Sequence, residues 1–328
     1  MTVWALARWP MLVHGLTVSA LLSACSAAPV VVLPNKSCPA AGKADPLQAP
    51  VQLGIVNGQV TQNNDNMDRA TVALQIVSSY SDGRQGVGTC TAVVVSRRIL
   101  ISAGHCFAVR DQETAKQVFA VTSTDLEKSK RNETIAAAKF TVHPEYNGSF
   151  HDIAVVELRS DLPALYSPTS FALDLATLTE ETPVVLIGFG QTSDQDNASA
   201  GIKRRTESML DKVINRENFP RTSIVNQIRV FDRSGENRGA CFGDSGGPGF
   251  IKSTQQVFGV VQGVNSTVQP SPNPSCMTGD ANYTMIAPYR EWIEQTAKIK
   301  LNSTPQKNPA AVRDTLDANG TSSITSCE

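Results

Sequence analysis

The sequence predicts an all-β protein from Ile55 onward. Short apolar, β-branched runs recur there between turn-forming residues, a texture typical of β-sandwiches and β-barrels. Helical periodicity is strong only near the end, where one helix face would carry Tyr289, Trp292, Ile293, Thr296 and Ile299. Hydrophobic residues make up 41% of the 328-residue chain and charged residues 18%. That composition supplies a sizeable core and argues against wholesale disorder.

Residues 1–25 are predicted to be a secretory signal. Arg8 is the only charged residue before Cys25, and the stretch from Met11 to Ala24 is mostly apolar. The four residues ending at Cys25 read LSAC, which resembles the bacterial lipobox. That resemblance implies acylation of Cys25 and a lipid anchor in a bacterial cell envelope, with Ser26 permitting sorting to the outer membrane.

The rest of the chain follows in order. Residues 26–54 are rich in Ala, Pro, Val and Gln and are predicted to be a linker or propeptide. Strand-like runs cover residues 70–77, 92–95, 118–121 and 153–158, then residues 183–188, 228–231 and 257–261. Residues 301–328 form a polar tail.

Charge and hydropathy exclude two classes of protein. With 29 Lys+Arg against 30 Asp+Glu, the net charge is -1, so the basic face of a nucleic-acid binder is not expected. No uninterrupted apolar run reaches about 18 residues, so a membrane-spanning helix is not predicted. The lipid anchor is the only membrane contact expected.

The motif Gly243-Asp244-Ser245-Gly246-Gly247 is the first sign of chemistry. Its G-x-S-x-G pattern fits the nucleophile elbow of α/β-hydrolases, whose histidine follows the serine. Here all four histidines precede the serine: His14, His105, His143 and His151. The α/β-hydrolase reading therefore fails on chain order, and an esterase of that fold is disfavoured. A subtilisin-like enzyme would need an aspartate before the histidine and its own serine motif, which is not found.

Three segments remain in the order histidine, aspartate, serine. They are LISAGHC around His105, HDIAVVEL around Asp152 and CFGDSGGP around Ser245. Taken alone, the serine motif fits an ordinary turn, His105-Cys106 fits core packing or a metal ligand, and His151-Asp152 fits a surface pair. Together they closely resemble the chymotrypsin/trypsin-like serine proteases. The resemblance implies two packed antiparallel six-stranded β-barrels, over residues 55–172 and 173–300, with a C-terminal helix and a site in the cleft between them. His143 and His151 are expected outside the triad.

The resemblance also implies a role for each residue. His105 would be the general base, Asp152 would hold its tautomer, and Ser245 would be the nucleophile. The backbone N–H groups of Gly243 and Ser245 would form the oxyanion hole. Gln262 stands where the family usually has a serine that helps to orient the triad carboxylate, so this part of the geometry departs from the pattern.

Ile55-Val56-Asn57-Gly58 resembles the N-terminus that appears when a family zymogen is cut. The new ammonium of Ile55 would pair with Asp244 and order the oxyanion loop. The residue before the cut is Gly54 rather than Arg or Lys. A trypsin-like activator is therefore not expected, and either another protease or the enzyme itself would make the cut.

The primary specificity pocket is predicted to lack an acid. Trypsin itself has an aspartate six residues before the nucleophile, and counting back from Ser245 gives Gly239. Val264 would narrow the entrance and Ala281 would form the opposite wall. These residues predict a preference for small or medium apolar side chains. Asp280 would offer a substitute acid if the alignment slipped by one residue.

The seven cysteines are predicted to divide into one lipid site and six other cysteines. The family pattern implies Cys90–Cys106 and Cys241–Cys276. Cys38 and Cys327 remain, and if they pair they would tether the propeptide to the tail. No C-x-x-C pair is present, so zinc is not expected, and no metal or cofactor is predicted. Such cysteine use is typical of an oxidising compartment.

These observations predict a secreted, lipid-anchored, monomeric serine endopeptidase that acts on peptide or protein substrates. The alternative is a non-catalytic relative that serves as a binding or regulatory module.

Overall fold

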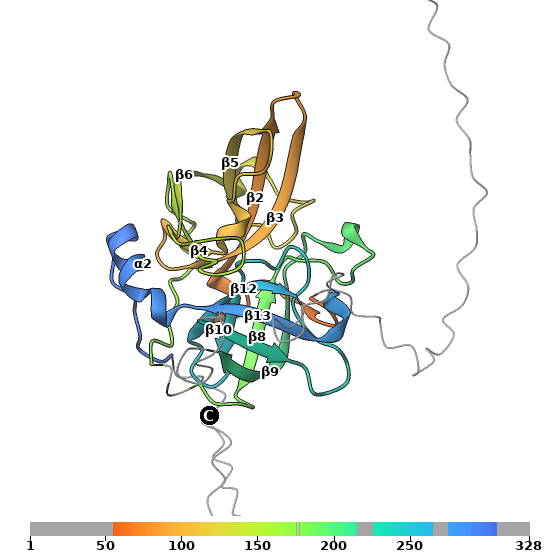
Figure 1. Cartoon of the computed structure of the whole chain (residues 1–328), viewed down its shortest axis with the longest axis vertical. Helices are drawn as coiled ribbons and strands as arrows, with labels where there is room; N and C mark the ends of the chain where they lie inside the picture. The colour runs from red at the N-terminus through yellow and green to blue at the C-terminus, as the bar shows by residue number, and fades with distance from the viewer. Residues whose placement is uncertain (1–54, 175, 177, 215–225, 265–274, 307–328) are drawn as a thin grey trace, which may run out of the picture. The chain divides into compact units, whose positions relative to one another are not determined.

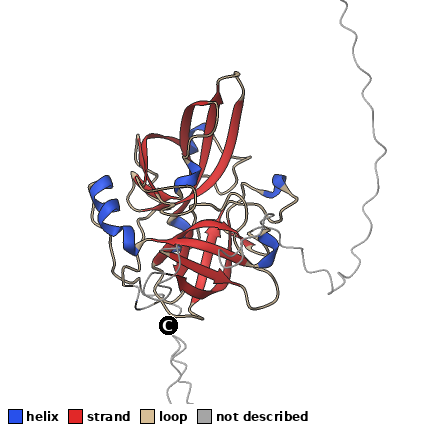
Figure 2. Ribbon diagram, in the orientation of Figure 1, coloured by secondary structure: helices blue, strands red, loops and turns tan. Residues whose placement is uncertain are grey.

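The computed structural model describes residues 55–174, 176, 178–214, 226–264 and 275–306, which all lie in one unit, Pro50–Glu328. Strands dominate these residues (Figure 2), so the all-β prediction is confirmed. The α-helices are short: α1 (Asn66–Arg69) and α2 (Arg290–Ala297). None of the helices in the described part of the chain is long and apolar enough to cross a membrane.

The first barrel is antiparallel and closed, in the order β2-β3-β4-β7-β6-β5. Its strands are β2 (Thr71–Tyr80), β3 (Gln85–Val94), β4 (Ile99–Ser102), β5 (Glu113–Val121), β6 (Thr134–Val142) and β7 (Ala154–Leu158). Alternate residues of β2, namely Val72, Leu74 and Ile76, enter its core, as expected when successive side chains point to opposite faces.

The second barrel closes because β8 pairs with both β9 and β11. Around it run β8 (Pro183–Gly188), β9 (Arg204–Ile214), β10 (Gln227–Phe231), β13 (Asp280–Met285), β12 (Val257–Val264) and β11 (Pro248–Ile251). A short strand, β1 (Gln59–Val60), adds to the edge of β9. Figure 1 shows the two groups of strands, and the prediction of two six-stranded barrels is confirmed.

The barrels share a hydrophobic core. One buried cluster joins Val93 and Ile101 of the first barrel to Phe250 and Val260 of the second. Ile293 of α2 is buried in the same cluster. The C-terminal helix is therefore present as predicted, but it ends earlier than the periodicity suggested.

The end of α2 is set by Lys298, which caps the helix in the left-handed conformation at φ 56°. Ile299 was predicted to lie on the helix, and that placement is wrong because the chain turns before it. The residue still packs, partly buried, against the shared core. The apolar pattern thus predicted correctly that Ile299 packs against the core. It did not predict the end of the helix, because that end is set by the backbone conformation of Lys298.

Gly246 is confined at the contact between the barrels. Its φ is +79°, and a Cβ there would lie 2.0 Å from Ser102 Oγ and 2.5 Å from the Thr91 carbonyl oxygen. Gly246→Ala is expected to lower the free energy of unfolding by about 2–5 kcal/mol, because left-handed strain adds to overpacking. Urea unfolding measures this. Gly83→Ala is the matched control, since Gly83 has φ +83° but nothing within 4 Å. Equal losses in both variants would refute the packing argument.

Candidate active site

His105 and Asp152 meet where β4 ends and β7 begins. Antiparallel pairing places Ser102 of β4 opposite Ala154 of β7. The short 3-10 turn Gly104–Cys106 follows Ser102 and therefore lies beside Asp152, which precedes β7. Asp152 Oδ2 lies 2.7 Å from His105 Nδ1, and Asp152 Oδ1 accepts the His105 backbone N–H at 2.7 Å. Asp152 is 2% exposed. Both Asp152 carboxylate oxygens therefore contact His105, and these two contacts fix the orientation of the imidazole ring.

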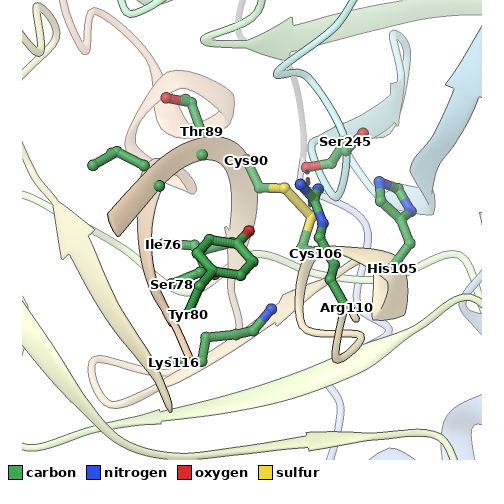
Figure 3. A pocket seen from close by; sticks show the side chains of 13 residues that line it. Ile76, Ser78, Tyr80, Thr89, Cys90, His105, Cys106, Arg110, Lys116 and Ser245 are labelled. Atoms are coloured by element: carbon green, nitrogen blue, oxygen red, sulfur yellow. Dashed lines mark hydrogen bonds between the residues drawn. A yellow bond between two sulfur atoms is a disulfide. The ribbon is translucent and has the colours of Figure 1, made fainter. Parts of the chain in front are cut away.

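Ser245 shares a cavity with His105. The cavity has a volume of about 250 Å³ and is also lined by Cys90 and Cys106. Figure 3 shows the two side chains beside this disulfide. The first barrel holds the serine through its backbone, because the Thr91 N–H donates to the Ser245 carbonyl at 2.8 Å. The structure thus brings together the three residues that the motif order singled out.

Two backbone N–H groups near Ser245 have no protein acceptor among the described residues. The Gln191 N–H donates to the Phe242 carbonyl at 2.8 Å. Since N–H and C=O point in opposite directions across a trans peptide, the Gly243 N–H points away from Gln191. Among the described residues, neither the Gly243 nor the Ser245 N–H has a protein acceptor.

Gly243 must be glycine for this arrangement. Its φ is +101°, and a Cβ would lie 3.0 Å from the Gly190 Cα. A side chain would therefore both strain the turn and push against the neighbouring loop. The geometry gives two N–H donors in the same turn as the Ser245 hydroxyl, which is what an oxyanion requires.

Asp244 is fully buried beside this turn. Its Oδ1 accepts the Gly190 N–H at 2.7 Å and its Oδ2 accepts the Cys241 N–H at 2.8 Å. Burial raises the pKa of Asp244 to about 7, although the two N–H groups act in the opposite direction. A Cβ on Gly188 or Gly190 would lie 2.0 or 2.5 Å from the carboxyl group. This glycine cradle was not predicted, although Gly188-Phe189-Gly190 stands at the end of a strand-like run.

The N-terminal residues of the described chain reach the same region. Ile55 is 1% exposed, and Val56 forms a β-bridge with Gly239. Val56 also clusters with the Cys241–Cys276 disulfide, and the backbone N–H of Cys241 binds Asp244. Ile55, Val56 and the buried Asp244 carboxylate therefore lie in one part of the second barrel. In the described residues, no salt bridge reaches Asp244.

The residues predicted for the specificity pocket come from neighbouring strands. Val264 of β12 pairs with Ala281 of β13. A Cβ on Gly239 would lie 3.3 Å from the Gly279 Cα, so a larger residue there would press on the backbone. Residues 265–274, which follow Val264, lie outside the described residues.

Asp280 is not a substitute acid for the pocket. It binds Arg229 through both oxygens, to Nε and Nη2 at 2.9 Å each. Successive strand residues point to opposite faces, so Asp280 faces away from Ala281, which is buried in the barrel core. The suggestion that Asp280 could replace the missing aspartate is therefore wrong.

The remaining predicted residues have mixed outcomes. Cys90–Cys106 and Cys241–Cys276 form disulfides as predicted, whereas Cys25, Cys38 and Cys327 lie outside the described residues. Gln262 accepts the Gln227 amide at 2.5 Å and donates to the Ser149 carbonyl. Its hydrogen bonds therefore do not involve Asp152.

Comparison with known proteins gives the family. The family model described as Trypsin matches residues 55–293. Pig trypsin is 24% identical over 63% of this chain and 84% of its own length. A chymotrypsin from the beetle Phaedon cochleariae is 24% identical over 74% of the chain and 82% of its own. The serine protease Hayan of Drosophila melanogaster is 20% identical, and the match spans only 42% of its length. These relatives are animal proteins and do not support the bacterial source inferred from the lipobox.

Solved structures agree on the fold. The structure described as HL collagenase aligns with a TM-score of 0.56 at 18% identity, covering 75% of this chain and 100% of that one. Human heparin binding protein aligns with a TM-score of 0.55 at 16% identity, covering 77% and 99%. Because the family model covers well over half of the sequence and the fold agrees, the chain belongs to the trypsin family of serine proteases.

Proposed function

We propose that this chain is a serine endopeptidase that works through an acyl-enzyme. The observation that carries the proposal is the double contact of Asp152 with His105 beside the Ser245 cavity. An Nδ1–H donated to Asp152 leaves the other ring nitrogen, Nε2, unprotonated. That nitrogen takes the proton of Ser245 as the hydroxyl attacks the substrate carbonyl, and later passes it to the leaving amine.

The free N–H groups of Gly243 and Ser245 would stabilise the oxyanion formed in that attack. One such donor is typically worth about 10²–10³ in rate. Asp152 would stabilise the imidazolium, because its two carboxylate oxygens already lie 2.7 Å from His105 Nδ1 and from the His105 backbone nitrogen. The chain's own groups thus account for each proton and charge in the acylation step, and water reverses the sequence in deacylation.

We propose small or medium apolar side chains at the primary specificity pocket. Three features support this proposal. The position that holds an aspartate in trypsin is Gly239, and Val264 pairs with Ala281 across the neighbouring strands. The Asp280 carboxylate is bound by Arg229 and so is not available to a substrate. An arginine or lysine substrate would find no counter-charge among these residues.

We also propose that cleavage after Gly54 activates the enzyme. The buried Asp244 carboxylate has hydrogen bonds but no ion pair in the described residues, and a new Ile55 ammonium would supply one. A pocket for small residues would accept Gly54, so the enzyme could cut itself. If the purified Ser245→Ala chain were still cut after Gly54, self-cleavage would be excluded.

Labelling with a fluorophosphonate tests the proposal. The chain that begins at Ile55 is expected to be labelled at Ser245, because the probe reacts with an activated serine. The Ser245→Ala variant is the control and should not be labelled. Absence of labelling would overturn the protease assignment. It would favour the non-catalytic alternative, which Gln262 supports because its hydrogen bonds do not involve the triad carboxylate.

Secretion, acylation of Cys25, attachment to an outer membrane, the monomeric state and a Cys38–Cys327 disulfide remain proposals. Cys25, Cys38 and Cys327 lie outside the described residues. Intact mass of the protein isolated from membranes would show whether Cys25 carries lipid.

A further inference from the structure

A second histidine cluster lies next to Asp152 but is not used by the proposed reaction. His143 directly follows β6, and its N–H donates to the Ile153 carbonyl at 3.0 Å. The intervening loop brings Glu145 and His151 back to His143. The two imidazole rings stack with centroids 5.2 Å apart and planes at 13°.

The hydrogen bonds around this cluster identify the unprotonated nitrogen of each ring. His143 Nδ1 accepts the Glu145 backbone N–H at 3.3 Å. His151 Nδ1 lies 3.1 Å from the Tyr289 hydroxyl, which itself accepts the Asn226 amide at 3.4 Å. The Tyr289 proton is therefore available for His151, and the network assigns Nδ1 of both rings as acceptors.

A carboxylate completes the set. Glu145 Oε2 lies 3.9 Å from His151 Nδ1, too far for a hydrogen bond. One nitrogen from each ring and one Glu145 oxygen lie within 4.8 Å of one another. Three possible ligand atoms therefore lie close enough together for one cation to bind all of them once the side chains adjust.

We propose that His143, Glu145 and His151 bind a divalent transition-metal ion, with zinc the best match. Two imidazoles and one carboxylate are typical zinc ligands and leave a fourth position for water. Zinc bonds of about 2.0–2.2 Å put tetrahedral ligands about 3.4 Å apart. The ligand atoms, which lie within 4.8 Å of one another, therefore need to approach by up to about 1.4 Å.

The side chains are arranged to allow that approach. Glu145 is 72% exposed and free to swing, whereas His151 is 24% exposed. The histidines are supported from α2, because His143 packs against Tyr289 and Trp292. The sequence criterion of cysteine spacing did not detect this site, because its nitrogen ligands are histidines.

Calorimetric titration with zinc sulfate tests the site in the full chain carrying Ser245→Ala, which prevents self-cleavage. One ion per chain is expected to bind, and Glu145→Gln and His151→Asn are each expected to weaken the affinity by at least about 10-fold. Glu145→Gln changes an exposed side chain and should not perturb folding. Glu127→Gln, an equivalent change at another exposed glutamate, should bind as the parent does.

Two further measurements separate this site from others. His105→Ala should keep the zinc affinity, because the triad histidine is not a ligand. Cobalt in place of zinc should give visible bands without the near-ultraviolet thiolate band that Cys38 or Cys327 would produce. The proposal is overturned if no ion binds, if Glu145→Gln and His151→Asn bind as tightly as the parent, if His105→Ala abolishes binding, or if the thiolate band appears. None of these outcomes depends on protease activity.

Discussion

Ser245→Ala is expected to lower kcat by on the order of 10⁶-fold in the chain that begins at Ile55. Alanine keeps the backbone N–H at position 245, so the oxyanion donors and the substrate contacts survive while the attacking oxygen is lost. The residual rate should therefore remain about 10³–10⁴ above that of water alone. Hydrolysis of a peptide with a small apolar residue before the scissile bond measures both rates.

The triad should also behave as one unit. His105→Ala alone is expected to cost about as much as Ser245→Ala, and the double variant little more, because the hydroxyl is a poor nucleophile without its base. Asp152→Asn should cost about 10⁴-fold, since an amide cannot hold the productive tautomer. If the losses from Ser245→Ala and His105→Ala instead multiplied in the double variant, the two residues would be acting independently and the mechanism would be wrong.

The sequence was sufficient to select His105, Asp152 and Ser245 as the candidate triad, because the evidence for them is local and ordered. Each motif is contiguous, and the position of all four histidines before Ser245 eliminates the rival hydrolase fold. The closure of the barrels could not be predicted in this way. It depends on pairing between β2 and β5 and between β8 and β9. Strand periodicity does not show which strands pair, so the prediction of closed barrels came from the family resemblance.

Register and long-range contacts set the limits of prediction elsewhere. Asp280 and Ala281 are neighbours in sequence, yet one lies on the outer face and the other in the core, so a one-residue uncertainty reverses the conclusion. The contact of His151 with Tyr289 joins a loop of the first barrel to the turn before α2. A local sequence pattern does not predict a contact between residues so far apart in the chain.

Asp244 should make the uncleaved chain less stable as the pH rises from about 4 to 7. Its pKa is raised from 3.8 in the unfolded chain to about 7 in the fold by burial. The folded state therefore binds the additional proton between these values, and the stabilisation is lost as the pH rises through 7. At 1.36 kcal/mol per pH unit, the loss amounts to roughly 4 kcal/mol. Urea unfolding of the Ser245→Ala chain at pH 5 and pH 7 covers two of these pH units and should show a loss of about 2–3 kcal/mol.

Asp244→Asn is the control, because an amide does not titrate and should remove this part of the pH dependence. Lys203 does not interfere in this range. Burial lowers its pKa from 10.5 to about 7, so its proton linkage falls above pH 7. In the chain that begins at Ile55, the new ammonium should keep Asp244 ionised and lower its pKa, so the loss between pH 5 and 7 should disappear. An unchanged loss after cleavage would show that the ammonium does not reach Asp244, and the proposed activation switch would fail.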